Sequence, residues 1–116
     1  MGTNAVLKFR GINDRIIGMM LDGSPQNLNY LSSLAFTIAR EKRILTLFRG
    51  GNSEALNKVF DALIEKHCDW LFADSPRNPE WVSYFAILDP KTAIVTHHEE
   101  YPANGPGHDY KLSQFR

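Results

Sequence analysis

Two stretches of this chain repeat apolar residues at helical spacing, and short apolar runs of strand length flank and separate them. The apolar residues of the first stretch are Leu28, Leu31, Ala35, Ile38 and Ala39, and those of the second are Leu56, Val59, Phe60, Leu63 and Ile64. The short runs are residues 16–21, 44–48 and 70–73. Short apolar runs that alternate with amphipathic helices are typical of α/β proteins with parallel strands.

This order of patterns predicts an α/β fold built on a single mixed sheet of about 5–6 strands. We expect the order β-β-α-β-α-β-β-β, with a parallel β-α-β-α-β centre, two main helices and flanking hairpins. With 116 residues there is room for one domain. We place it over residues 1–100, and expect residues 101–116 to be an irregular C-terminal tail or a docked segment.

The ends of the sheet are less regular in sequence. Residues 5–10 alternate apolar and basic side chains, which is typical of an outer strand with one wet face. Residues 16–21 are apolar throughout, as in a strand covered on both faces, and we expect the two strands to form a hairpin. Residues 78–88 fit either a helix or a strand, and we favour a hairpin with residues 92–98 because aromatic and β-branched residues dominate.

The charge balance argues against a polyanion partner. Lys and Arg total 13, Asp and Glu total 13, and the net charge is +0. Residues 1–58 carry +4 and residues 59–116 carry −4, but an α/β fold interleaves the two halves. Nucleic-acid binding through Lys8, Arg10 and Arg15 is therefore the least favoured reading.

The cysteine count and the N-terminal residues indicate a compartment. Cys68 is the only cysteine, which fits a reducing environment. The first residues show no basic segment followed by an apolar core, and no apolar run approaches the ~20 residues that span a bilayer. We therefore expect a cytoplasmic protein with no membrane partner.

The segment from Arg49 to Ser53 is the first candidate ligand site. It follows an expected strand and precedes an expected helix, so Gly50 and Gly51 would let a ligand approach the backbone. Arg49 could add a bidentate contact to a phosphate, and Asn52 and Ser53 are polar. The alternative is a tight turn in which Asn52 or Ser53 caps the helix.

Two further loops follow expected strands and carry Asp22 with Ser24, and Asp74 with Ser75. Ligands bind outside the carboxyl ends of strands in open α/β sheets, so we include both serines among the ligand-binding candidates. The aspartates are candidates for acid–base catalysis. Two scattered aspartates are a poor set for Mg²⁺, and they equally fit turn residues, so we expect no metal and no cofactor.

The segment from His97 to Glu100 is the third candidate. On a strand, His97 and Glu99 share one face, and His108 or Asp109 from the tail could complete an acid–base or metal site. The spacing matches no zinc motif, and a solvated strand end explains it as well. His97 and Glu99 join the catalytic candidates on this basis.

The sequence leaves open whether the chain is an enzyme, because it contains no Gly-x-Ser-x-Gly or Ser-x-x-Lys motif. We expect a small binding module, such as a regulator, inhibitor or immunity-type protein, that acts through protein–protein contact. The alternative is an enzyme or receptor for a phosphate-bearing metabolite or nucleotide at the strand ends. An exposed sheet edge would also allow a homodimer.

Overall fold

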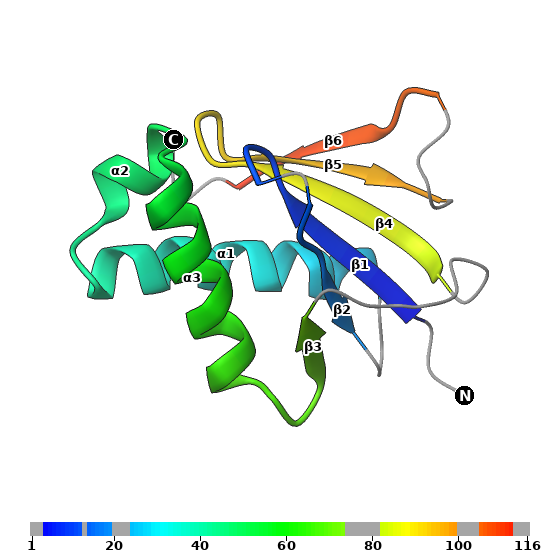
Figure 1. Ribbon diagram of the computed structural model, residues 1–116. Helices are drawn as coiled ribbons and strands as arrows, with labels where there is room; N and C mark the ends of the chain where they lie inside the picture. Colours follow the sequence, from blue (N-terminus) through cyan, green and yellow to red (C-terminus); the bar gives the residue numbers. More distant parts are fainter. Residues whose placement is uncertain (1–3, 13, 20–23, 74–81, 100–104, 113–116) are drawn as a thin grey trace.

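Six strands and three helices make up the computed structural model, which describes residues 4–12, 14–19, 24–73, 82–99 and 105–112 (Figure 1). The elements are β1 (Asn4–Phe9), β2 (Ile17–Met19), α1 (Pro25–Glu41), α2 (Leu45–Arg49), α3 (Ser53–Lys66), β3 (Leu71–Ala73), β4 (Val82–Asp89), β5 (Ile94–His98) and β6 (His108–Lys111). The strands form one mixed sheet in the order β3-β2-β1-β4-β5-β6. The predicted α/β class with a mixed sheet is confirmed.

The sheet differs from the prediction at its centre. Among the described strands only β1 and β4 pair in parallel, and the other neighbouring pairs are antiparallel. The strand expected at the outside, β1, lies between β2 and β4, while β3 is an edge strand. The hairpin of β1 and β2 and the hairpin of β4 and β5 are both confirmed.

The prediction of a central strand over residues 44–48 was wrong, because Leu45–Arg49 is helix α2. The Phe48 amide donates to the Ile44 carbonyl at 2.9 Å, which closes a helical turn. Only Phe48 of this helix is fully buried, and Leu47 is 52% exposed. A five-residue apolar run has no periodicity that separates a strand from a buried helical turn.

The main core lies between the helices and one face of the sheet (Figure 1). Phe9 at the end of β1 meets the rings of Phe48 and Phe60 edge-on, at centroid distances of 5.9 and 6.1 Å. Phe36 of α1 meets Phe48 in the same way at 5.2 Å. These contacts join β1 to all three helices, and edge-to-face geometry favours them beyond the apolar area that they bury.

The two long helices begin at capping residues, and for α3 this is the capping alternative stated for Asn52. Ser24 caps α1 by accepting a hydrogen bond from the Asn27 amide at 3.2 Å, and Pro25 takes the first helical position. Asn52 caps α3 by accepting from the Ala55 amide at 3.0 Å. All five predicted core residues of α1 are buried, as are four of the five predicted for α3.

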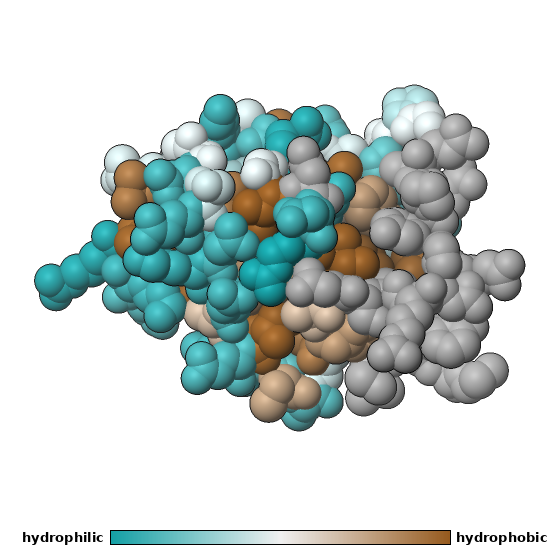
Figure 2. All heavy atoms as spheres, viewed as in Figure 1, coloured by the Kyte–Doolittle hydropathy of each residue, from teal (hydrophilic) through white to brown (hydrophobic). Residues whose placement is uncertain are grey.

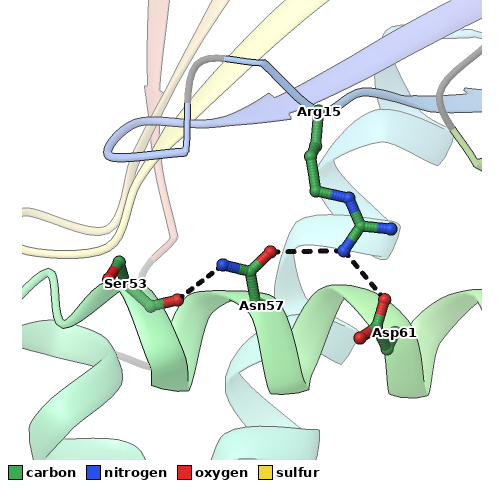
Figure 3. Close-up of polar contacts among 4 residues, drawn as sticks. All are labelled: Arg15, Ser53, Asn57 and Asp61. Atoms are coloured by element: carbon green, nitrogen blue, oxygen red, sulfur yellow. Dashed lines mark hydrogen bonds and ion pairs between the residues drawn. The ribbon is translucent and has the colours of Figure 1, made fainter.

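Arg15 fastens the connection between β1 and β2 to α3 (Figure 3). Its guanidinium donates to Asp61 Oδ1 at 2.9 Å and to Asn57 Oδ1 at 3.2 Å. It also lies 4.0 Å from the centroid of the Phe60 ring. The Asn57 amide in turn donates to the Ser53 carbonyl at 2.9 Å, which holds its oxygen toward Arg15. These contacts occupy one of the three basic side chains considered for nucleic-acid binding.

A second, smaller apolar cluster lies on the other face of the sheet. It contains Val6, Val82 and Phe85, with Ile16 and Ile87 packed against it. Val6 is only 1% exposed, so this face of β1 is not the fully wet face that alternation predicts.

The two halves of the chain interleave in the sheet, because β1 and β2 lie between β3 and β4. Within the segment expected to be an irregular or docked tail, His108–Lys111 pairs with β5, and Leu112 is buried in the main core.

Figure 2 shows hydrophilic side chains over most of the region that α2 and α3 occupy in this view. In the described part of the chain, no helix has the length and hydrophobicity needed to cross a bilayer.

Candidate functional site

The glycine segment connects two helices rather than a strand and a helix. Gly50 ends α2, and its amide donates to the carbonyl groups of Phe48 and Thr46. Gly51 has a φ of 79°, a conformation that suits glycine, and it directs the chain into α3. Asn52 is the cap of α3. The turn-and-cap reading therefore describes the local geometry, while a ligand role for this segment stays a prediction.

The remaining residues of this segment are at the surface. Arg49 lies in the last turn of α2, where a basic side chain interacts favourably with the negative end of the helix dipole. Ser53 begins α3 and is exposed. Of the other loop candidates, Ser24 serves as the cap of α1. Asp22, Asp74 and Ser75 lie outside the described residues.

Gly51 does border a cavity of about 290 Å³ at the carboxyl ends of the parallel strands β1 and β4. Its other lining residues are Arg10, Gly11, Asp89, Pro90 and Lys91. A Cβ added at Gly51 would come within 3.0 Å of Lys91 Cε, so glycine allows this lysine to approach. Arg10 Nε lies 3.8 Å from Asp89 Oδ2, which leaves the cavity with two cations and one anion.

The histidine candidates gather at a different place, a pocket of about 320 Å³ between α1 and the strands β4, β5 and β6. We call it the histidine pocket. It is lined by Pro25, Asn29, Tyr84 and residues 97–99 and 108–110. Ala86, His97 and His108 occupy opposite positions on β4, β5 and β6, so their side chains share the helix-covered face. His97, Glu99, His108 and Asp109 all line this pocket, although the register places only His97 and His108 side by side on the helix-covered face.

Asn29 orients the His97 ring. His97 Nε2 lies 2.7 Å from Asn29 Oδ1, and because a carbonyl oxygen accepts, Nε2 carries the proton. In a neutral imidazole Nδ1 is then an acceptor, and this atom is buried with no hydrogen-bond partner in the described structure. Burial lowers the pKa of His97 below its ordinary value of 6.5, and His98 and His108 lower it further. These surroundings therefore favour the neutral form of His97.

The opposite face of this sheet edge carries different contacts. The His98 ring stacks on Phe85 at a centroid distance of 5.8 Å. The Thr96 hydroxyl donates to Asp109 Oδ1 at 2.8 Å, which links β5 to β6. No set of three or more His, Cys, Asp and Glu residues within the described ranges is arranged to share a metal ion.

Several residues that line these two cavities were not among the sequence candidates, including Asn29, Tyr84 and Lys91. Asn29 follows Pro25 by one helical turn, and Tyr84 lies on the strand that we found hardest to assign. Lys91 belongs to the predicted turn between β4 and β5. The position of Asn29, one turn after the start of a helix, is only a weak sequence signal for a site residue. The predicted hairpin already places Tyr84 beside β5, whereas only the tertiary fold brings Lys91 beside Gly51.

The fold and the histidine pocket define a small α/β protein with a concave site at one edge of its sheet. No family model, no curated protein and no solved structure matches this chain.

Proposed function

We propose that the protein is a small binding module that acts through contact with a partner protein, as regulators and inhibitors do. The histidine pocket is the observation that carries this proposal. Pocket-lining Tyr110 is 49% exposed at its rim, and tyrosine is enriched at the centres of protein interfaces. A cytoplasmic location belongs to the same proposal, because Cys68 is the only cysteine.

The pocket chemistry indicates what the partner contributes. Tyr84 and Tyr110 offer aromatic walls, whereas Asn29, His97 and His108 offer polar groups. Such walls suit an aromatic or aliphatic side chain that ends in a hydrogen-bonding group.

A matched pair of surface variants tests this proposal. Tyr110→Ala removes the exposed ring at the pocket, and Leu47→Ala removes a side chain of similar exposure on α2. The partner is a protein that both the wild type and Leu47→Ala capture from native extract. We expect this protein to bind Tyr110→Ala at least about tenfold more weakly than it binds the wild type, because truncating an interface anchor costs on the order of 2 kcal/mol. Equal binding by both variants would contradict the proposal. Deleting residues 101–116 would test it poorly, since that also removes β6 and the buried Leu112.

A second candidate function is binding of a phosphate-bearing metabolite or nucleotide. The observation that favours it is the cavity bordered by Gly51, because Arg10 and Lys91 flank it at the carboxyl ends of a parallel strand pair. The candidate aspartates Asp22 and Asp74 would serve such an enzyme or receptor as acid–base groups.

Thermal unfolding with inorganic phosphate and with ATP tests this candidate. At a ligand concentration of 100 times Kd, a bound ligand stabilises the wild type by about 2.7 kcal/mol. We expect Lys91→Ala to lose this stabilisation, because Lys91 lines the cavity, and Arg49→Ala to retain it, because Arg49 does not. No stabilisation of the wild type, or an equal effect in Lys91→Ala, would count against phosphate binding at this cavity.

A further inference from the structure

Strand β6 has one side that no described strand covers. It forms the edge of the sheet, paired only with β5 among the described strands (Figure 1). All four of its residues are exposed, and Tyr110 is one of the three large apolar side chains exposed in the described structure. An edge strand presents unpaired N–H and C=O groups that can pair with another strand.

The direction of these backbone groups follows from one hydrogen bond. The Leu112 amide donates to the Ala93 carbonyl at 2.9 Å, so the backbone groups of Leu112 point toward β5. Backbone groups alternate in direction along a strand, so those of Tyr110 and His108 also point toward β5. The groups of Asp109 and Lys111 therefore point away from the sheet, at the free edge.

This alternation limits how β6 can pair with β6 of a second copy. In a two-fold antiparallel pair, outward-pointing residues must lie opposite outward-pointing residues. Three registers pair the outward-pointing residues of β6 with one another. They place Asp109 opposite Asp109, Lys111 opposite Lys111, or Asp109 opposite Lys111.

Charge selects among the three registers. The first two place like charges directly opposite each other, which is destabilising in a sheet. In the third, each Asp109 lies opposite the Lys111 of the other copy, and symmetry makes this favourable contact twice. Tyr110 then lies opposite Tyr110 on the two-fold axis. Both rings are on the helix-covered face, because Tyr110 pairs with the buried Val95.

We propose that two copies of this chain associate through β6 in this register, so that their sheets join into one. The inference does not rest on the proposed partner protein. It places the two histidine pockets side by side, because Tyr110 lines each of them. The pairing strands are short, and interfaces below about 1,200 Å² are typically weak. We therefore expect a dimer whose formation depends on concentration in the micromolar range.

Charge reversal tests the pairing by sedimentation equilibrium. We expect Lys111→Glu and Asp109→Lys each to weaken dimerisation at least tenfold, because each places like charges opposite each other. The double variant D109K/K111E reverses both members of each pair and should restore the dimer. Lys66→Glu, an exposed charge reversal at the end of α3, should leave it unchanged. A wild type that stays monomeric to about 1 mM, roughly a thousandfold above the expected micromolar range, or a double variant that stays as weak as the singles, would overturn the proposal.

Cysteine cross-linking tests the register independently. In a Cys68→Ser background, each single variant Asp109→Cys, Tyr110→Cys and Lys111→Cys carries one thiol. Only the residue on the two-fold axis meets its own copy directly, at a distance that a disulfide can bridge. We therefore expect oxidation to cross-link Tyr110→Cys, and the other two much more slowly. Faster cross-linking of Asp109→Cys or Lys111→Cys would overturn the assigned register, whether or not any partner protein binds the histidine pocket.

Discussion

His97 shows how one side chain ties the histidine pocket to the stability of the fold. Its ring is held by Asn29, and the charges of His98 and His108 on the same sheet edge oppose its protonation. Protonation would add an N–H group at the buried Nδ1 and a positive charge to the ring, and this N–H group would have no acceptor in the described structure. The folded protein therefore favours the neutral ring.

This preference predicts a pH dependence of stability. Because the pKa of His97 is lower in the folded state than its ordinary value of 6.5, the unfolded chain binds more protons between those two values. The contribution to stability is complete above about pH 6.5 and is lost as the pH falls toward the folded pKa. We expect urea unfolding between pH 5 and 8 to show a steeper loss for the wild type than for His97→Gln. Parallel curves for the two proteins would contradict this assignment.

At the same scale, the residues whose roles were readable from sequence are those that act locally. Ser24 and Asn52 each accept a hydrogen bond from an amide three positions further on, and Pro25 begins its helix without a distant partner, so the sequence contains all that is needed. Asn29 and His97 are 68 positions apart, and no local pattern links them. Gly51 is intermediate, because its turn conformation was predictable but the approach of Lys91 was not.

At the scale of elements, Arg15 joins a hairpin connection to a helix. Its side chain is only 25% exposed, and it combines an ion pair, a hydrogen bond and a contact with an aromatic ring. Arg15→Met keeps an apolar stem but removes the charge. We expect it to lower the free energy of unfolding by about 1–2 kcal/mol, because the contacts are partly desolvated and share one guanidinium.

The matched control for this variant is Arg10→Met, at the residue directly after β1. Arg10 is 61% exposed and its ion pair with Asp89 is long, at 3.8 Å. Exposed ion pairs contribute little, so we expect a change below about 0.5 kcal/mol in the same chemical-denaturation experiment. Equal losses for the two variants would show that Arg15 does not fasten the connection to α3.

Element types were predictable where the pattern was long and uncertain where it was short. The 17-residue α1 and the 14-residue α3 carry several turns of apolar spacing, and both were predicted. The five residues of α2 form little more than one turn, and Leu and Phe fill helices and strands alike. Phe48 is helical because it packs between Phe9 and Phe36, which are distant in sequence.

At the scale of the whole molecule, the strand order is what the sequence could not provide. If residues 44–48 are a strand, the simplest sheet places this strand parallel to its neighbours in the sequence. Without that strand, β1 finds its parallel partner in β4, with Ala5 opposite Tyr84. Both candidate cavities depend on this order, because one lies at the carboxyl ends of β1 and β4 and the other where β4, β5 and β6 adjoin.

The parallel pair of β1 and β4 also has a consequence for how the protein is made. β1 leaves the ribosome before β4, because its partner β4 is synthesised only after all three helices are complete. Until then one side of the central strand has no hydrogen-bonding neighbour, although β2 can already cover the other side. The sheet therefore closes late in synthesis, and the nascent chain carries an exposed, apolar strand edge for most of that time, a state prone to aggregation.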